Sequence, residues 1–378
     1  MAEDTNNARH PGAPDWAETA RSAARAKLRD LAARKGATFL HATVAGQYPD
    51  EPAWYWTSGF WPGLLRLLLN EGEDPELERL AREAEDRLYA VLGSEDFHEL
   101  HHDVGFQFLP TSVMRYRQRG NADARTRGIV AAHLLMGRFN AAGQVIEAWN
   151  VEERRGFAII DTVMNLSLLF WASETTGEPR YANLARTHLE KVRQEFVRPD
   201  FTTHHIVEFD QTTGARRTAH GGQGYAPDSA WSRGMAWAVY GHAIAARYTS
   251  DDAYRETARR VADAFLALNA PHGVPPWDFR APDAETAPRD SSAAAIVACG
   301  LLELADGGDP AARGQAEDLL RILLDRCATF DRPDEEALLR HATSSLPNDI
   351  HVDAGIVYGD YFFYEALQRL GGIRPVCW

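Results

Sequence analysis

The sequence predicts an all-α fold, a closed (α/α)6 barrel built from six helical hairpins, that is, twelve helices. Two observations lead to this prediction. Five segments share one pattern, in which a short polar turn rich in Gly, Asp and Pro precedes an amphipathic helix. Each of them follows a second segment that is apolar or aromatic on most sides, as expected of a helix that is buried on most sides. One helix that opens the chain and one that closes it make the sixth pair.

The expected helices follow in order along the chain. Residues 16–36 open it and residues 359–370 close it. The amphipathic outer helices are expected at 72–92, 120–135, 176–192, 249–268 and 307–324, and the apolar inner helices at 58–69, 104–116, 159–172, 229–248 and 291–305. The rival architecture is an open superhelix of helical repeats. Regular alternation of inner and outer helices favours the closed double ring.

Long loops follow two of the hairpins, at 199–230 and 330–353. Long loops on a rigid scaffold commonly carry functional sites. Residues 201–219 are expected to contain a small β-hairpin that turns at Thr213 and Gly214. No break in composition indicates a second domain. Residues 16–378 are therefore expected to form a single barrel domain. Residues 1–15, which precede the first expected helix, are expected to be a flexible tail.

Charge and composition restrict the partners and the compartment. The net charge of -14 argues against nucleic acid or an anionic membrane as a partner, because both require clustered Lys and Arg. Only three cysteines occur, far apart, so a disulfide framework is not expected. The N-terminal residues lack the features of a signal peptide, and no apolar run approaches membrane-spanning length. The expected compartment is the cytoplasm.

Asp161 is the most unusual charged residue. It is the only one in the stretch "FAIIDTVMNLSLLFWA", residues 157–172, whose other side chains are apolar or neutral. Burying a carboxylate without a partner is costly and raises its pKa towards that of a useful general acid. The alternative is a structural role, in which Asp161 caps a helix or bonds a neighbouring backbone amide.

Asp103, in "HHDVGF" at 101–106, is the second candidate acid. A protonated and an ionised carboxyl are the usual pair for adding water across a glycosidic or related bond. A metal site is the less favoured interpretation, because the adjacent His101 and His102 are expected to point in different directions. A structural role for both imidazoles at a helix start is the other alternative. The sequence therefore predicts catalysis without a metal or a cofactor.

Aromatic residues gather in "WYWTSGFWPG" and "SAWSRGMAW". Such rings can stack on sugar faces, and an Arg among them, Arg233, can clamp a carboxylate in bidentate fashion. Core packing is slightly favoured for Trp237, whereas Trp56 suits a sugar platform at least as well as core. Trp231 belongs to the same cluster as Arg233.

Further polar candidates lie in the long loop before Arg233. His205, His220 and Gln223 are expected either to bond sugar hydroxyls or a carboxylate, or to be ordinary surface groups. Asp290, in "RDSSAAA", is interpreted most simply as the N-cap of the helix that follows it.

Taken together, the motifs resemble those of the unsaturated glucuronyl hydrolases, glycoside hydrolase family 88. The segments that carry the resemblance run in order from about residue 16 to about residue 371: "WTSGFWPG", "HHDVGF", "IIDTVMNLSLLFWA", "WSRGMAWAVYG", "WDF", "RDSSAAAIVACGLLELA" and "YGDYFFYEALQRL". The resemblance implies an (α/α)6 barrel in which Asp103 and Asp161 are the essential acids. It also implies substrate contacts from Trp56, His102, His205, Gln223, Trp231, Arg233 and Trp237.

The implied reaction removes a non-reducing terminal 4,5-unsaturated glucuronic acid from oligosaccharides that lyases produce. In the family's scheme the acid that matches Asp161 protonates C4 and assists attack of water at C5, and a hemiketal then collapses. An ionised Asp103 would stabilise the developing cation. The expected partner is therefore an unsaturated uronic-acid oligosaccharide, bound by a monomer or a homodimer.

The segment "HATSSLPNDIHVD" at 341–353 contains no Lys, although related enzymes often carry a Ser/Lys cluster there that reads sulfate. We therefore expect a preference for unsulfated substrates. Two alternatives remain open at this point. One is an unsaturated rhamnogalacturonyl hydrolase, and the other, from a different functional class, is a non-catalytic carbohydrate-binding barrel.

Overall fold

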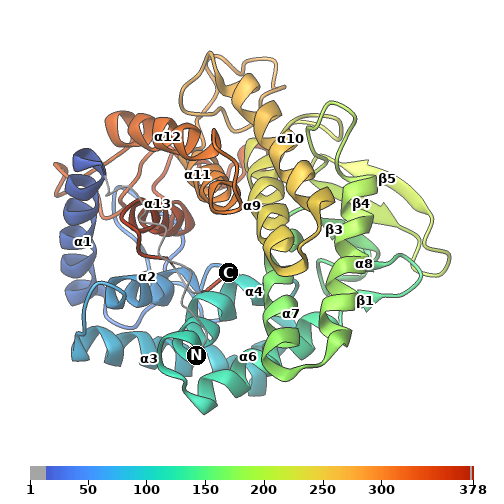
Figure 1. The fold of residues 1–378 in the computed structure, drawn as a ribbon, viewed down its shortest axis with the longest axis horizontal. Helices are drawn as coiled ribbons and strands as arrows, with labels where there is room; N and C mark the ends of the chain where they lie inside the picture. Colours follow the sequence, from blue (N-terminus) through green and yellow to red (C-terminus); the bar gives the residue numbers. More distant parts are fainter. Residues whose placement is uncertain (1–13, 375–376) are drawn as a thin grey trace, which may run out of the picture.

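The computed structural model describes residues 14–374 and 377–378. Its helices form two concentric rings (Figure 1). The outer ring consists of α1 (Asp15–Lys35), α3 (Pro75–Ala90), α6 (Ala122–Met136), α8 (Pro179–Glu195), α10 (Asp252–Asn269) and α12 (Ala312–Arg326). The inner ring consists of α2 (Phe60–Leu69), α4 (Val104–Phe108) with α5 (Met114–Arg119), α7 (Thr162–Thr176), α9 (Ser232–Thr249), α11 (Ser291–Asp306) and α13 (Val357–Leu370). Apart from Pro14 and Asp15, the expected tail at 1–15 lies outside the described residues.

The inner ring is closed. α13 packs against both α11 and α2, and each of the other inner helices packs against the next one along the chain. The predicted barrel is therefore confirmed, and the open superhelix is excluded. The two rings also differ in burial as predicted: every residue of α7 from Thr162 to Ala172 is buried, whereas α8 buries one stripe of residues at helical spacing.

The second inner helix is interrupted. A π-helical turn, Leu109–Val113, joins α4 to α5, and it contains Pro110. Proline has no amide hydrogen for the regular helical hydrogen bond, and the wider turn accommodates it within one continuous segment. Counted with this segment as one helix, the described part of the chain contains the twelve helices expected.

A three-stranded antiparallel sheet lies outside the rings (Figure 1). The predicted hairpin is present as β4 (Ile206–Phe209) and β5 (Arg216–His220). Gly214 in its turn has a positive φ of 71°, and a side chain there would meet the backbone of Ala142. The third strand, β3 (Phe157–Ile159), pairs with β4 and was not predicted. A short hairpin of β1 (Phe139–Asn140) and β2 (Val145–Ile146) adds to this side of the molecule.

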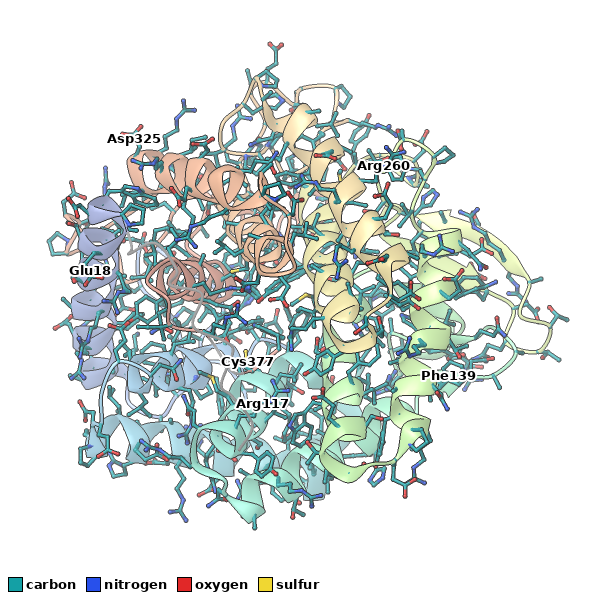
Figure 2. All side chains as sticks on the ribbon, in the orientation of Figure 1. Glu18, Arg117, Phe139, Arg260, Asp325 and Cys377 are labelled. Carbon is teal, nitrogen blue, oxygen red and sulfur yellow. The ribbon has the colours of Figure 1, made fainter. Side chains whose placement is uncertain are left out.

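Side chains fill the space inside the inner ring (Figure 2), and aromatic rings from several of its helices pack against one another there. Trp378 is buried there and stacks on Phe362 with ring centroids 5.6 Å apart. Its indole N–H donates to Glu365 at 2.7 Å. The barrel is thus a packed core rather than a channel, and a ligand site must lie at one of its ends. No helix in the described ranges is both long and apolar enough to cross a membrane.

Buried imidazoles are expected to make the free energy of unfolding depend on pH. Burial lowers the pKa of six of them: His41, His101, His102, His188, His205 and His242. In the unfolded chain an imidazole binds a proton near pH ~6.5, whereas His188 in the folded chain does so at about 3. The unfolded state therefore binds more protons between these pH values, and stability is expected to fall as the pH drops through this window.

Buried carboxyl groups oppose this trend. Burial raises the pKa of Asp161 to about 6 and that of Asp360 to about 7, so these groups favour the folded state as the pH falls. The imidazoles outnumber them, and a lower urea midpoint at pH ~5 than at pH ~7.5 is the expected net result. An equal or higher midpoint at the lower pH would contradict the prediction.

Candidate active site

The two predicted acids lie at the N-terminal ends of neighbouring inner helices. Asp103 directly precedes α4, and Asp161 follows β3 and directly precedes α7. Asn165, one turn into α7, connects them: its amide nitrogen lies 3.3 Å from Asp103 Oδ1 and 3.3 Å from the backbone oxygen of Asp161. The side chain of Asp161 makes no capping bond to α7, so the helix-cap alternative for this residue is not supported.

Both carboxyl groups have raised pKa values. Burial raises the pKa of Asp161 to about 6, although the Arg233 charge and the Trp237 indole N–H act in the opposite direction. Burial and the neighbouring Asp161 raise the pKa of Asp103 well above its usual range. The sequence suggested a polar setting that keeps Asp103 ionised, whereas its buried position in the structure favours the protonated form. Two close acids that both resist ionisation hold protons near neutral pH more readily than isolated carboxyls do.

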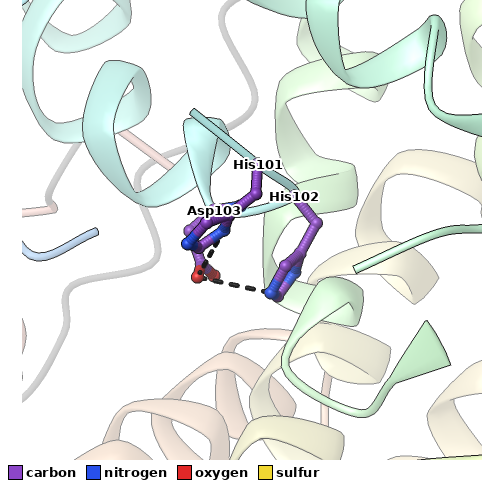
Figure 3. Close-up of side chains that lie close together, drawn as sticks. All are labelled: His101, His102 and Asp103. Atoms are coloured by element: carbon purple, nitrogen blue, oxygen red, sulfur yellow. Dashed lines mark hydrogen bonds and ion pairs between the residues drawn. The ribbon is translucent and has the colours of Figure 1, made fainter. Parts of the chain in front are cut away.

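The two histidines of "HHDVGF" point the same way, not in different directions as the sequence suggested (Figure 3). Their rings are stacked, with centroids 5.2 Å apart and an interplanar angle of 21°. His101 Nδ1 and His102 Nε2 each lie 3.3 Å from Asp103 Oδ2. The chain turns into α4 immediately after His102, and this turn brings both rings to one side of the carboxyl group. The predicted divergence of the two rings, which disfavoured a metal site, is therefore wrong.

His205 faces the other acid. Its Nδ1 lies 2.9 Å from the backbone nitrogen of Gln223 and 3.2 Å from the backbone oxygen of Gly221. The shorter contact is with a group that can only donate, and we therefore assign the ring hydrogen to Nε2. That nitrogen lies 3.7 Å from Asp161 Oδ2. The ring also packs on Trp231, with centroids 4.2 Å apart. His205 is thus a fixed neutral donor directed at Asp161.

Arg233 does not have the free fork that was predicted. One terminal nitrogen donates to Asp290 and, at 2.6 Å, to the backbone oxygen of Thr343, and the other donates to Gln223 Oε1 and, at 2.5 Å, to the backbone oxygen of Ser344. These four terminal N–H bonds all go to protein acceptors. The expected bidentate clamp on a substrate carboxylate is therefore replaced by a positioning role. Because the oxygen of Gln223 faces Arg233, its amide N–H groups point away and can donate to a ligand.

Asp290 is likewise not the helix cap that was predicted. It occupies the N-cap position of α11, but its side chain bonds no backbone amide of that helix. Its carboxylate pairs with Arg233 and accepts from the Ser292 hydroxyl. A fully buried Arg needs a counter-charge, and this requirement takes the carboxylate away from the helix end.

The three tryptophans differ in exposure. Trp237 and Trp231 are buried, whereas Trp56 is partly exposed and packs against Phe106 and Tyr358. The predicted core packing of Trp237 is confirmed by its contacts with aromatic rings of the barrel interior. Its indole nitrogen nevertheless has no hydrogen-bond partner of normal geometry.

Polar atoms without partners gather around the two acids. They are buried and belong to His102 (Nε2), Asp161 (Oδ2), His205 (Nε2), Trp237 (Nε1) and Tyr358 (hydroxyl). Buried polar groups in native proteins are almost always hydrogen-bonded. Other such atoms occur elsewhere in the described residues, for example in His188 and His242, but here several belong to side chains that surround one place. A polar ligand that bonds to them would satisfy all of these atoms together.

Comparison with known proteins identifies the family. Residues 33–315 match the model of Glycosyl Hydrolase Family 88. The chain belongs to this family. It is 36% identical to the unsaturated glucuronyl hydrolase of Bacillus sp. (strain GL1), an alignment that covers 83% of this chain and 86% of that protein. It is 31% identical to the unsaturated chondroitin disaccharide hydrolase of Streptococcus pyogenes serotype M1, over 87% of this chain and 84% of that one.

Solved structures agree with this assignment. The unsaturated glucuronyl hydrolase from Bacillus sp. GL1 superposes with a TM-score of 0.89 at 33% identity, over 94% of this chain and 96% of that one. The enzyme from Streptococcus agalactiae gives a TM-score of 0.89 at 28% identity, over 100% of this chain and 98% of that one. As a family 88 member the protein is a glycoside hydrolase, and the alternative of a non-catalytic sugar-binding barrel is not supported.

The structure of this family 88 member adds residues that the sequence did not single out. Asn165 lies four positions after Asp161 on the same helix face, so its spacing could have identified it. Tyr358 lies beside Arg233, whose guanidinium carbon is 5.4 Å from the centre of its ring, and no local pattern marks it. His220 lies on β5, where it pairs with Glu208, and takes no part in this cluster.

Proposed function

We propose that the protein removes the non-reducing terminal 4,5-unsaturated glucuronic acid from lyase-generated oligosaccharides by hydrating the C4–C5 enol ether. The observation that carries the proposal is the meeting of Asp103 and Asp161 among buried polar atoms that have no partners. The names of the relatives support the choice of substrate, since one acts on unsaturated glucuronyl groups and another on unsaturated chondroitin disaccharides.

In this proposal Asp161 is the general acid and then the general base. It donates its proton to C4, and positive charge develops on C5 and the ring oxygen. Asp161 then takes a proton from the water that adds to C5. The resulting hemiketal opens, and the glycosidic bond breaks to release the remaining saccharide. Proton transfer by a positioned group of this kind typically contributes about 10²–10⁴-fold to the rate.

Substrate binding itself would place the proton on Asp161. The free-site pKa of about 6 leaves this group only partly protonated at neutral pH. A bound uronate brings a negative charge and displaces water, and both effects raise the pKa of a nearby carboxyl group. Asp103 accepts a hydrogen bond from the side-chain amide of Asn165, which acts against the effect of burial on its pKa and stabilises its anion. It is therefore proposed to balance the cationic transition state.

The remaining contacts are proposed to hold the sugar. The amide of Gln223, oriented by Arg233, and the hydroxyl of Tyr358 supply donors for the uronate. His102 and His205 face the two acids, and the partly exposed Trp56 supplies a ring surface, with Trp231 behind His205. The inner helices all begin at this end of the barrel, and the partial positive charge of helix N-termini favours an anionic ligand.

The direct test follows the ultraviolet absorbance of the enol ether in lyase-generated unsaturated disaccharides. Loss of absorbance with a glucuronyl disaccharide supports the proposal. An unsaturated galacturonyl-rhamnose disaccharide provides the comparison, because faster turnover of that substrate would favour the rhamnogalacturonyl alternative. No turnover of either disaccharide would reject the proposed function.

Removing the indole N–H near Asp161 is expected to shift the pH profile. Trp237→Phe keeps a large ring in the core but deletes a group that lowers the pKa of Asp161. The pKa of Asp161 should therefore rise, and the alkaline limb of kcat/KM that reports loss of its proton should move to higher pH. Rates across pH ~4–9 measure this shift. A profile unchanged in position would contradict the assigned contact.

Unsulfated substrates are expected to be turned over faster than sulfated ones. The described loop 341–353 carries no Lys, so it offers no ammonium group to pair with a sulfate. A solved relative from Streptococcus agalactiae is a complex with the sulfated disaccharide dGlcA-GalNAc6S, which shows that a related site can accept sulfate. Comparing kcat/KM for matched sulfated and unsulfated disaccharides decides the matter, and a preference for the sulfated one would contradict the prediction.

A further inference from the structure

His101, His102 and Asp103 bring three potential metal ligands together. Two nitrogen–oxygen separations, from His101 Nδ1 and from His102 Nε2 to Asp103 Oδ2, are both 3.3 Å. The three atoms all lie within 4.8 Å of one another, and no other such group of His, Cys, Asp and Glu occurs in the described ranges 14–374 and 377–378. The proposed hydrolysis assigns no chemical step to His101, so this arrangement has a feature that the reaction does not explain.

Two of the three separations match those of a tetrahedral metal centre. Zn²⁺ binds imidazole nitrogen and carboxylate oxygen at about 2.0–2.2 Å, and tetrahedral angles then place neighbouring ligand atoms about 3.3 Å apart. Two of the three separations already have this value (Figure 3). The third, between the two imidazole nitrogens, can close by rotation of His101, whose side chain is 23% exposed. The same exposure gives an ion access from solvent.

An independent observation concerns His102. Its Nε2 is buried and has no hydrogen-bond partner of normal geometry. Its Nδ1 lies 3.0 Å from the Thr162 hydroxyl, which can accept a hydrogen from it. Metal-binding histidines almost always donate the hydrogen of their other nitrogen in this way, which fixes the ring and leaves the ligating lone pair free. That lone pair would point towards Asp103.

We propose that His101, His102 and Asp103 form a Zn²⁺ site whose occupation inhibits the enzyme. Two imidazole nitrogens and one carboxylate oxygen suit Zn²⁺ better than Mg²⁺ or Ca²⁺, which prefer sets of oxygen ligands. The ion would take the carboxylate that otherwise balances the transition state, and water or a substrate hydroxyl would complete the coordination. The inhibition rests on the proposed function, whereas the binding does not.

Calorimetric titration of the full-length, chelator-dialysed protein with ZnCl2 tests the binding without reference to activity. We expect one ion per chain, and binding at least about tenfold weaker in His101→Ala, since loss of an outer-shell partner alone typically costs 10–100-fold. His98→Ala is the matched control, because His98 is exposed and lies outside the group. No saturable 1:1 binding, or equal affinity in wild type and His101→Ala, would overturn the site.

The visible spectrum of the Co²⁺-loaded protein gives a second readout, since intense d–d bands are expected for tetrahedral coordination and should be lost in His101→Ala.

Activity measurements then separate the proposed metal site from the proposed hydrolase function. Chelator-treated wild type should turn over the disaccharide, and added Zn²⁺ should suppress this turnover. Restoration of activity by Zn²⁺ after chelation would overturn the inhibitory role. Binding of one ion by a chain that turns over no unsaturated disaccharide would support the site and reject the proposed function.

Discussion

Asp161→Asn is expected to lower kcat/KM for an unsaturated glucuronyl disaccharide by about 10³-fold or more, while the protein remains folded. The amide keeps the shape of the side chain but can neither donate the catalytic proton nor take one from water. Folding should not suffer, because Asp161 makes no capping bond to α7 and the change removes an ionisable group from a buried position. Loss of enol-ether absorbance measures the rate, and urea denaturation measures the stability.

Two further variants make this experiment specific. Asp103→Asn is expected to lose about 10²–10³-fold, because it removes the negative charge that balances the transition state. Asp325→Asn is the matched control, since this residue lies on the exposed face of α12, and it should retain wild-type activity. Activity near the wild-type level in Asp161→Asn would refute the role of this residue, whatever the other variants do.

Arg233→Met is expected to have the second-largest effect, on stability as well as on rate. The change leaves Asp290 buried without its counter-charge, and breaking a buried ion pair in this way typically costs about 3–5 kcal/mol. It also releases Gln223 and the backbone at Thr343 and Ser344. We expect a markedly lower urea midpoint and a loss of kcat/KM for the same disaccharide.

The double variant Arg233→Met with Asp290→Asn separates the two effects. Neutralising Asp290 removes the unpaired charge, so most of the lost stability should return. Activity should not return, because Gln223 remains unoriented and the loop remains unheld. Recovery of both properties would show that Arg233 serves only to neutralise Asp290 and has no part in positioning the site.

Much of the fold follows from local patterns. Polar turns mark the starts of outer helices, as at Asp74 and Asp251. Outer helices are amphipathic, whereas inner helices are apolar on most sides. These two patterns were enough to place both rings. Asp161 was recognisable because it is a lone charge in an apolar stretch of sequence. The hairpin turning near Gly214 was also predictable, whereas β3 was not, since a three-residue strand has too little periodicity to detect.

The site depends on contacts that local patterns do not contain. Three of the four acceptors of Arg233 lie 57 and 110 or more positions away in the chain, and only Gln223 is near it, so no local pattern indicated that its fork was already occupied. The parallel direction of His101 and His102 comes from the chain leaving regular structure before α4, whereas the sequence argument assumed helix or strand geometry throughout. Because the two rings point the same way, a metal site at His101, His102 and Asp103 became possible again.

The way Arg233 holds the loop 341–353 has a consequence for adaptation. It binds this loop through the backbone oxygens of Thr343 and Ser344, which every amino acid provides, rather than through their side chains. Substitutions along the loop can therefore change the side chains that it presents, while Arg233 still holds its backbone in place. Variation of the loop's side chains and retention of its position are in this way assigned to different atoms of the same segment.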